Sequence, residues 1–144
     1  MKIIKIMTDS IRAYMQQDRI YVGTYGDTVG ISLDKACVWF IPKATYPFGV
    51  NAWLRGEEAV NWERIVPKDE IHDATLTNEM RLTEHNTTAQ KLTNGTIDVW
   101  INAKYLKYFD KCAKFKIIAW NRPVVVCEND ILVGMIMPLN MKNK

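Results

Sequence analysis

The sequence has few of the residues on which most catalytic and metal sites depend. It holds only two histidines, His72 and His85, and neither has a metal-ligand spacing to any of the three cysteines. Its seven glycines do not form a phosphate-binding loop or a nucleophile elbow. These absences argue against metal-dependent, phosphate-loop and nucleophilic catalysis. We therefore expect a protein that is not an enzyme and binds no cofactor.

Cysteine usage and hydrophobic runs indicate where the protein acts. Cys37, Cys112 and Cys127 are odd in number and contain no C-x-x-C pair. Each falls inside an expected helix or strand, where free cysteine behaves as a small hydrophobic residue. Met1 to Met7 is interrupted by two lysines, and no run approaches the roughly 20 apolar residues of a membrane span. We expect a cytoplasmic protein without membrane contact.

Length and composition indicate one folded domain over residues 1–144. The chain is 48% hydrophobic and has five tryptophans, which is enough for a core without disulfide or metal staples. The net charge of +3 is a mild excess. Its value as a sign of a polyanionic partner depends on whether the basic residues cluster.

The stretch from Asn102 to Met137 has the clearest pattern in the chain. Asn102 is a good N-cap, and the spacing after it predicts a helix over Ala103–Lys114. One face of this helix would be apolar and buried, with Tyr105, Leu106, Phe109, Cys112 and Ala113. The outward face would carry a stripe roughly 80° wide made of Lys104, Lys107, Lys111 and Lys114.

Short strands are expected on both sides of this helix. Thr96–Ile101 alternates in front of it, and Phe115–Trp120, Pro123–Cys127 and Ile131–Met137 follow it, parted by hairpin-length breaks. The order is β-α-β-β-β.

The start of the chain predicts the same order. Lys2–Ile6 alternates like a strand, and Asp9 or Ser10 can cap a short helix through Gln17. This helix would place Ile11, Tyr14 and Met15 on one side and Arg12, Gln16 and Arg19 largely on the other. Strands are expected at Arg19–Tyr25, Thr28–Leu33 and Ala36–Ile41. Two units, about residues 1–42 and 96–140, therefore predict an α+β fold. They would share an antiparallel sheet with the helices on one face.

Residues 43–95 predict a β-rich connection that is either an inserted ribbon or a crossover between the two units. Its expected parts are a turn at Tyr46–Gly49, a strand at Asn51–Arg55, an acidic loop at Asp69–Asp73, an imperfect strand at Ala74–Thr83 and a polar hairpin tip or loop at Asn86–Asn94.

Three motifs carry a resemblance to a known family. They are Asn102-Ala103-Lys104-Tyr105-Leu106, Ile136-Met137-Pro138-Leu139 and Trp62-Glu63-Arg64-Ile65-Val66-Pro67. They resemble, in turn, the N-x-x-Y-L that opens the last helix, the V-M-P-M ending and the aromatic-x-R-x-x-P box of the bacterial sliding clamp. That clamp is the beta subunit of the replicative DNA polymerase.

The resemblance implies a clamp-like domain whose basic helices face duplex DNA. The implied DNA contacts are Lys104, Lys107, Lys111, Lys114, Arg12 and Arg19. Met135, Met137, Pro138 and Leu139 would form one wall of an apolar pocket for partner peptides. One such domain cannot encircle DNA, so a ring would need several copies joined through unpaired edge strands.

Other interpretations remain open from the sequence. The lysine stripe is also typical of a solvated helix face, and the methionines of a last strand with a frayed end. The favoured function is a non-catalytic DNA-binding accessory of replication. The alternative is a protein-interaction module or inhibitor, of the kind a phage or mobile element encodes, that binds a replication protein. A third is a Mg²⁺-dependent nuclease built on Glu63, Asp69, Glu70 and Asp73.

Overall fold

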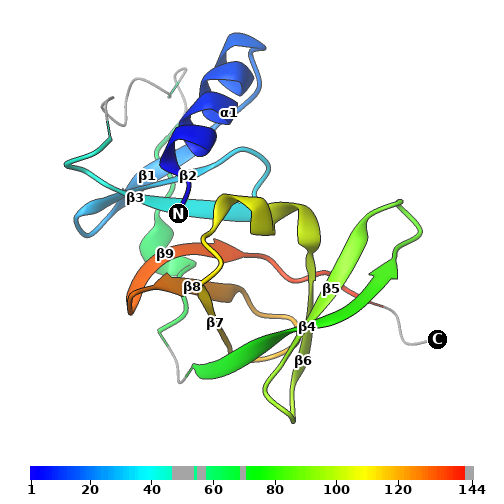
Figure 1. Ribbon diagram of the computed structural model, residues 1–144. Helices are drawn as coiled ribbons and strands as arrows, with labels where there is room; N and C mark the ends of the chain where they lie inside the picture. The colour runs from blue at the N-terminus through cyan, green and yellow to red at the C-terminus, as the bar shows by residue number, and fades with distance from the viewer. Residues whose placement is uncertain (47–53, 55–57, 69–70, 142–144) are drawn as a thin grey trace.

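The protein is an α+β fold in which a single antiparallel sheet carries one α-helix (Figure 1). The computed structural model describes residues 1–46, 54, 58–68 and 71–141. Within them lie helix α1 (Ile3–Met15) and the 3-10 helices η2 (Trp62–Arg64) and η3 (Ala103–Tyr108). The strands are β1 (Tyr21–Tyr25), β2 (Thr28–Ser32), β3 (Cys37–Pro42), β4 (His72–Leu82), β5 (Thr88–Thr93), β6 (Asp98–Asn102), β7 (Lys114–Ile117), β8 (Val124–Glu128) and β9 (Ile131–Ile136). Their order across the sheet is β1-β2-β3-β9-β8-β7-β4-β5-β6.

The strands expected in the two units are confirmed with small shifts, but the start of the chain is different. Lys2–Ile6 was predicted as a strand and instead opens α1, so Asp9 and Ser10 lie inside the helix rather than at its cap. The residues buried by α1 are Ile6, Met7 and Ser10, a helical spacing that an alternating strand cannot match. The Ser10 hydroxyl donates to the Ile6 carbonyl at 2.7 Å, which satisfies it inside the core.

The connection between the units forms part of the sheet. The pattern at Ala74–Thr83 is confirmed as β4. The hairpin tip or loop predicted over Asn86–Asn94 is right only for its first residues, because Asn86 lies in the turn after β4 but β5 occupies most of the range and pairs with β4 and β6. Gln90 made this strand look polar, yet its amide is buried and donates to the Thr77 carbonyl at 2.8 Å. The predicted turn at 46–49 and strand at 51–55 fall largely outside the described residues.

The helix predicted over Ala103–Lys114 is only half present. Asn102 caps it as expected, since its side chain accepts from the Lys104 amide at 3.0 Å, but η3 ends at Tyr108. Phe109 is extended and buried, and the next amide, that of Asp110, donates to Glu128 at 2.9 Å. These contacts turn the chain toward β7. The predicted burial of Tyr105 and Phe109 is confirmed, Leu106 is partly buried, and Cys112 is exposed, contrary to the prediction.

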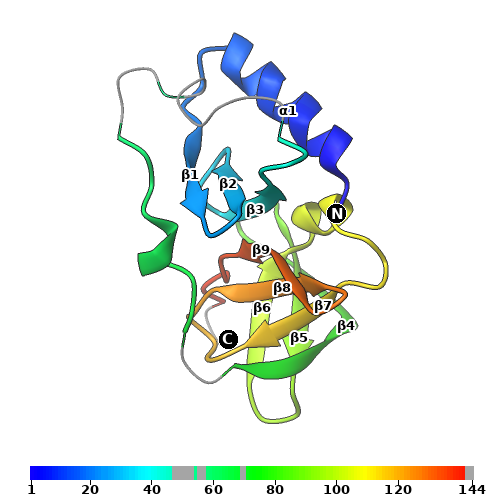
Figure 2. The ribbon, with the colours of Figure 1, turned by 90° about the vertical axis from the view of Figure 1, so that its left-hand side faces the viewer.

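The core lies on both faces of β3. Trp39 points toward α1 and η3, where its ring meets the Tyr108 ring with centroids 4.7 Å apart. Phe40 points the other way and packs edge-on against Trp62 of η2 at 6.3 Å. Figure 2 shows α1 and η3 on one side of the sheet and the segment that carries η2 on the other. Helices α1 and η3 therefore cover the same face of β3.

Chain segments cover part of each outer edge of the sheet. The Val60 amide donates to the Val22 carbonyl of β1 at 2.9 Å. At the opposite edge, Leu139 forms a bridge with Trp100 of β6, and its amide donates to the Trp100 carbonyl at 2.7 Å. Ring formation through open edge strands would have to displace these segments or pair beside them.

The close contact on β1 predicts that Gly23 has no room for a side chain. A Cβ atom at Gly23 would lie 2.0 Å from the Val60 carbonyl oxygen, which is backbone and cannot rotate away. We expect Gly23→Ala to lower the free energy of unfolding by about 1–3 kcal/mol, measured by urea denaturation. Thr24→Ser on the same strand should change it by about 0.5 kcal/mol or less. Equal midpoints for the two variants would contradict the packing of Val60 on β1.

Candidate functional site

Two tyrosines fix η3 to the elements around it. The Tyr108 hydroxyl donates to Asp9 of α1 at 2.7 Å, and the Tyr105 hydroxyl donates to the Asp34 carboxylate in the turn between β2 and β3. Asp34 is itself held by the Ala36 amide, which donates to its other oxygen at 2.9 Å. The Lys2 amide adds a backbone contact, donating to the Tyr108 carbonyl at 2.8 Å. The short helix is thus anchored at both of its turns.

The surroundings of these tyrosines keep their hydroxyls protonated. Burial raises the pKa of Tyr105 and of Tyr108 well above the usual value, and the hydrogen bonds to Asp34 and Asp9 raise both pKa values further. A protonated hydroxyl can donate to each carboxylate at any physiological pH. The two carboxylates therefore have partners other than the lysines nearby.

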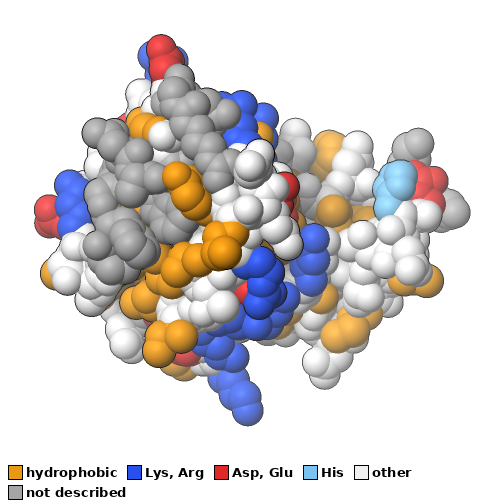
Figure 3. All heavy atoms as spheres, turned by 90° about the horizontal axis from the view of Figure 1, so that it is seen from above, with side chains coloured by type: hydrophobic (Ala, Val, Ile, Leu, Met, Phe, Trp, Pro, Cys, Tyr) orange, Lys and Arg blue, Asp and Glu red, His pale blue; other side chains and the backbone are white. Residues whose placement is uncertain are grey.

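Three lysines lie over these same two rings. The ammonium groups of Lys5 and Lys107 are 5.9 Å and 5.2 Å from the Tyr108 centroid, and that of Lys104 is 5.0 Å from the Tyr105 centroid. Each position suits a cation–π contact. We call this surface, formed by Lys5, Lys104 and Lys107, the α1/η3 face. Figure 3 looks down on it and shows basic side chains gathered near the middle of the view.

The lysines of the α1/η3 face are not neutralised by ion pairs. Among the described residues, no carboxylate lies within 4.0 Å of the Lys5, Lys104 or Lys107 ammonium group. Asp9 and Asp34, which lie beside the same two tyrosines, accept the tyrosine hydroxyls. The charge of the three lysines is therefore available to a ligand.

The structure separates the basic residues that the sequence grouped together. Lys104 and Lys107 share the α1/η3 face, and exposed Arg12 lies on α1, 3.9 Å from Asp9. Lys111 lies in the exposed turn after η3. Lys114 is in β7, where it alternates with the core residue Phe115 and so points to the other face of the sheet.

Arg19 is also apart from the α1/η3 face. Its guanidinium group lies 4.7 Å from the centroid of Tyr21, and Tyr21 packs against the core cluster on the η2 side of the sheet. Sequence reasoning missed Lys5 because it assigned Lys2–Ile6 to a strand. A helix beginning at Ile3 would have put Lys5 and Arg12, seven residues apart, on one side.

The proposed partner wall at the end of the chain is only partly accessible. Met135 is fully buried between Val38 and Phe40, so its assignment to a partner pocket is wrong. Met137, Pro138 and Leu139 are partly exposed. Of these, Leu139 lines two neighbouring grooves of about 550 Å³ and 400 Å³.

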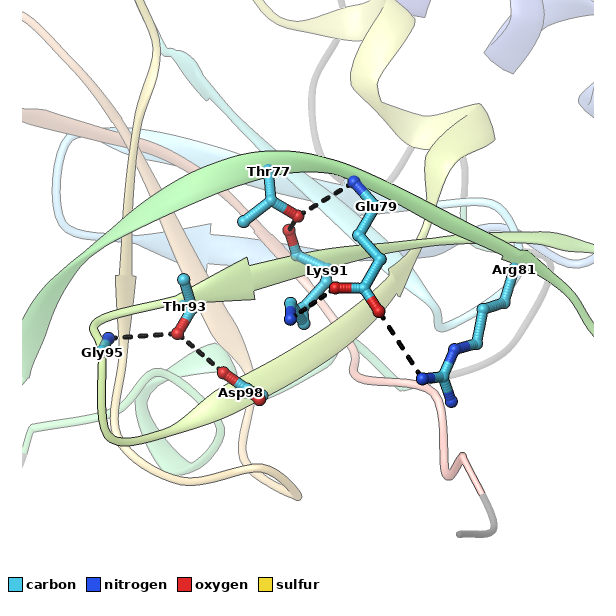
Figure 4. A network of polar contacts seen from close by, with 7 residues as sticks. All are labelled: Thr77, Glu79, Arg81, Lys91, Thr93, Gly95 and Asp98. Atoms are coloured by element: carbon cyan, nitrogen blue, oxygen red, sulfur yellow. Dashed lines mark hydrogen bonds and ion pairs between the residues drawn. The ribbon is translucent and has the colours of Figure 1, made fainter. Parts of the chain in front are cut away.

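The larger groove has charged side chains that neutralise one another (Figure 4). The Lys91 ammonium is 2.5 Å from one Glu79 oxygen, and the Arg81 guanidinium is 3.5 Å from the other. The hydrogen bond with Lys91 lowers the pKa of Glu79 and raises that of Lys91. Arg81 also stacks over Trp100 at 4.7 Å. Unlike the α1/η3 face, this groove presents no surplus of basic groups.

The acidic residues of the nuclease interpretation do not form a metal cluster where they are described. Glu63 pairs with Lys68 at 2.9 Å, and Asp73 lies in β4 opposite Lys116. No group of three potential metal ligands occurs among the described residues.

None of the helices in the described residues is long and apolar enough to cross a membrane. Comparisons with models of protein families, with curated proteins and with solved structures found no match.

The raised tyrosine pKa values predict a loss of stability in alkali. The folded state keeps protons on Tyr105 and Tyr108 that the unfolded state releases above about pH 10. The contribution of these two tyrosines to the free energy of unfolding is therefore constant below pH 10 and falls above it, by about 1.4 kcal/mol per pH unit for each tyrosine. Urea denaturation of Tyr105→Phe/Tyr108→Phe above pH 10 should show a shallower fall than wild type. Identical slopes for the two proteins would contradict the buried hydroxyls.

Proposed function

We propose that the protein is a non-catalytic DNA-binding accessory of replication with a sliding-clamp-like domain. Its α1/η3 face contacts the phosphates of duplex DNA. The observation that carries this proposal is the set of three ammonium groups held over Tyr105 and Tyr108, none of which has an ion-pair partner among the described residues. Lysines on one face repel each other, and contact with phosphates neutralises their charge. The same contact releases counterions condensed on the DNA, which favours binding.

The character of the face favours duplex DNA without sequence preference. Tyr105 and Tyr108 are buried and covered by lysines, so neither ring is open for a base to stack on. Single-stranded nucleic acid depends on such stacking for much of its affinity. Lysine acts as a point charge without the bidentate geometry that reads a base edge. The remaining mode of binding is contact with the sugar–phosphate backbone.

The clamp-like part of the proposal rests on element order and on two motif residues. A helix followed by three strands occurs as α1-β1-β2-β3 and again as η3-β7-β8-β9. Asn102 begins η3 as an N-cap, and Leu139 lies at the sheet edge beside β6. A strand precedes η3 but none precedes α1 in the described residues, so the two units differ there.

A protein-interaction module is the second candidate function. The grooves beside Leu139 favour it, because Leu139 and Met141 line both of them and the exposed indole of Trp120 lines the larger one. Aromatic and methionine side chains are enriched in protein interfaces.

The salt dependence of DNA affinity tests the first candidate. Lys104→Ala/Lys107→Ala should weaken binding equally for unrelated duplexes. The slope of log K against log salt should become shallower by roughly 1.8, about 0.9 for each phosphate that a lysine no longer neutralises. Fluorescence anisotropy with a labelled duplex at several salt concentrations measures both quantities.

The matched control removes the same charge from the other face of the sheet. Lys114→Ala/Lys116→Ala carries the same net charge, but both positions alternate with buried Phe115 and Ile117. This variant should keep the wild-type slope. Equal slope changes in the two double variants would mean that DNA binding depends on the net charge of the protein and not on the α1/η3 face. If the wild-type protein does not bind duplex DNA at low salt, the DNA proposal is wrong and the protein-interaction module becomes the favoured function.

A further inference from the structure

Helix α1 has a second exposed surface that DNA binding does not explain. Ile4, Ile11 and Met15 are 83%, 40% and 76% exposed. Exposed Thr8 lies between them, and its hydroxyl is satisfied by the Ile4 carbonyl at 2.8 Å. We call Ile4, Thr8, Ile11 and Met15 the outer α1 stripe.

The spacing of the stripe is that of a coiled-coil seam. Its residues follow one another at intervals of four, three and four, which matches positions d, a, d and a of a heptad. At 100° per residue the stripe is about 60° wide. A helix that adsorbs to a lipid surface needs a broader apolar face, whereas a seam this narrow fits the side of one other helix.

Basic residues flank the stripe on its open side. Lys5 and Arg12 occupy the two e positions of the same heptad register, and both are exposed. The g positions on the other flank are Met7, which is buried, and Tyr14, which packs against the core. Charged contacts with a partner helix are therefore possible only through Lys5 and Arg12.

The flanking charges decide what kind of helix can dock. In an antiparallel pair of two α1 helices, Lys5 and Arg12 would face their own copies and repel. In a parallel pair, Lys5 and Arg12 would face Met7 and Tyr14 of the other copy, which pack against the core and cannot offer a charged contact. A second copy of the chain is thus disfavoured. A helix with acidic residues beside its apolar seam complements both the shape and the charge.

We propose that the outer α1 stripe docks a single amphipathic helix of a protein partner, with apolar a and d residues flanked by glutamate or aspartate. The stripe supplies four seam residues over a helix of thirteen, so the interaction is weak and reversible alone. The docking surface shares Lys5 with the α1/η3 face, but the four residues of the outer α1 stripe lie outside that face, as do Lys104 and Lys107 outside the stripe.

Two designed peptides test the proposal on the full chain. Both have three heptads with leucine at a and d; one has glutamate at e and g, the other lysine. Titration of the ¹⁵N-labelled protein should shift amides of α1 with the glutamate peptide, at an affinity at least tenfold above that of the lysine peptide. Lys5→Glu/Arg12→Glu should reverse this preference. Equal affinity for the two peptides, or binding of neither, would overturn the proposal.

A second variant separates docking from DNA binding. Ile4→Ser/Met15→Ser should reduce peptide affinity at least tenfold and leave duplex affinity unchanged. Leu82→Ser/Ile131→Ser removes two exposed apolar side chains elsewhere and should bind the peptide as wild type does. Circular dichroism should show that all variants stay folded. Two other results would overturn the proposal. If the protein binds neither peptide but co-sediments with phosphatidylglycerol vesicles, the stripe binds a lipid surface. If the protein dimerises and Ile4→Ser/Met15→Ser abolishes the dimer, the stripe binds a second copy of the chain.

Discussion

The candidate site depends on two hydrogen bonds from buried tyrosines to carboxylates. Tyr108 to Asp9 joins η3 to α1, and Tyr105 to Asp34 joins it to the turn between β2 and β3. A 3-10 helix of two turns has poor intrinsic stability and needs such tertiary contacts to persist. The same bonds remove two carboxylates from the lysines around them. Packing and charge are therefore coupled, because the contacts that place the short helix also leave its lysines without acidic partners.

The sheet divides the surface into regions of different chemistry. The interior strand β3 is buried on both faces, with Trp39 on one and Phe40 on the other, so ligands are confined to what covers the sheet and to its edges. On the helix side the lysines are unpaired, whereas on β4 and β5 Lys91 and Arg81 share Glu79. The net charge of +3 is small, but the basic groups without acidic partners are unevenly distributed over the described surface. Distribution, more than net charge, determines where a polyanion binds.

Sequence patterns were informative where a structure is decided locally. β8 is a run of buried aliphatic residues after Pro123, and Asn102 caps η3 by contacting an amide two residues away. The end of η3 is decided by distant groups, since Glu128 accepts the Asp110 amide, and no spacing rule contains that contact. The N-terminal error has a different cause. Residues 2–6 are too short a run for an alternating pattern to be told from a helical one. That error hid Lys5, one of the three lysines of the α1/η3 face.

The central claim is that a polyanion contacts the α1/η3 face and no other basic surface. Lysine-selective ¹³C labelling, with NMR spectra recorded during titration by a short duplex, tests it most directly. The resonances of Lys5, Lys104 and Lys107 should shift together, starting from values displaced upfield by the Tyr105 and Tyr108 rings. Those of Lys114 and Lys116 should stay unchanged. Shifts spread evenly over all lysines, or confined to lysines outside this face, would contradict the account.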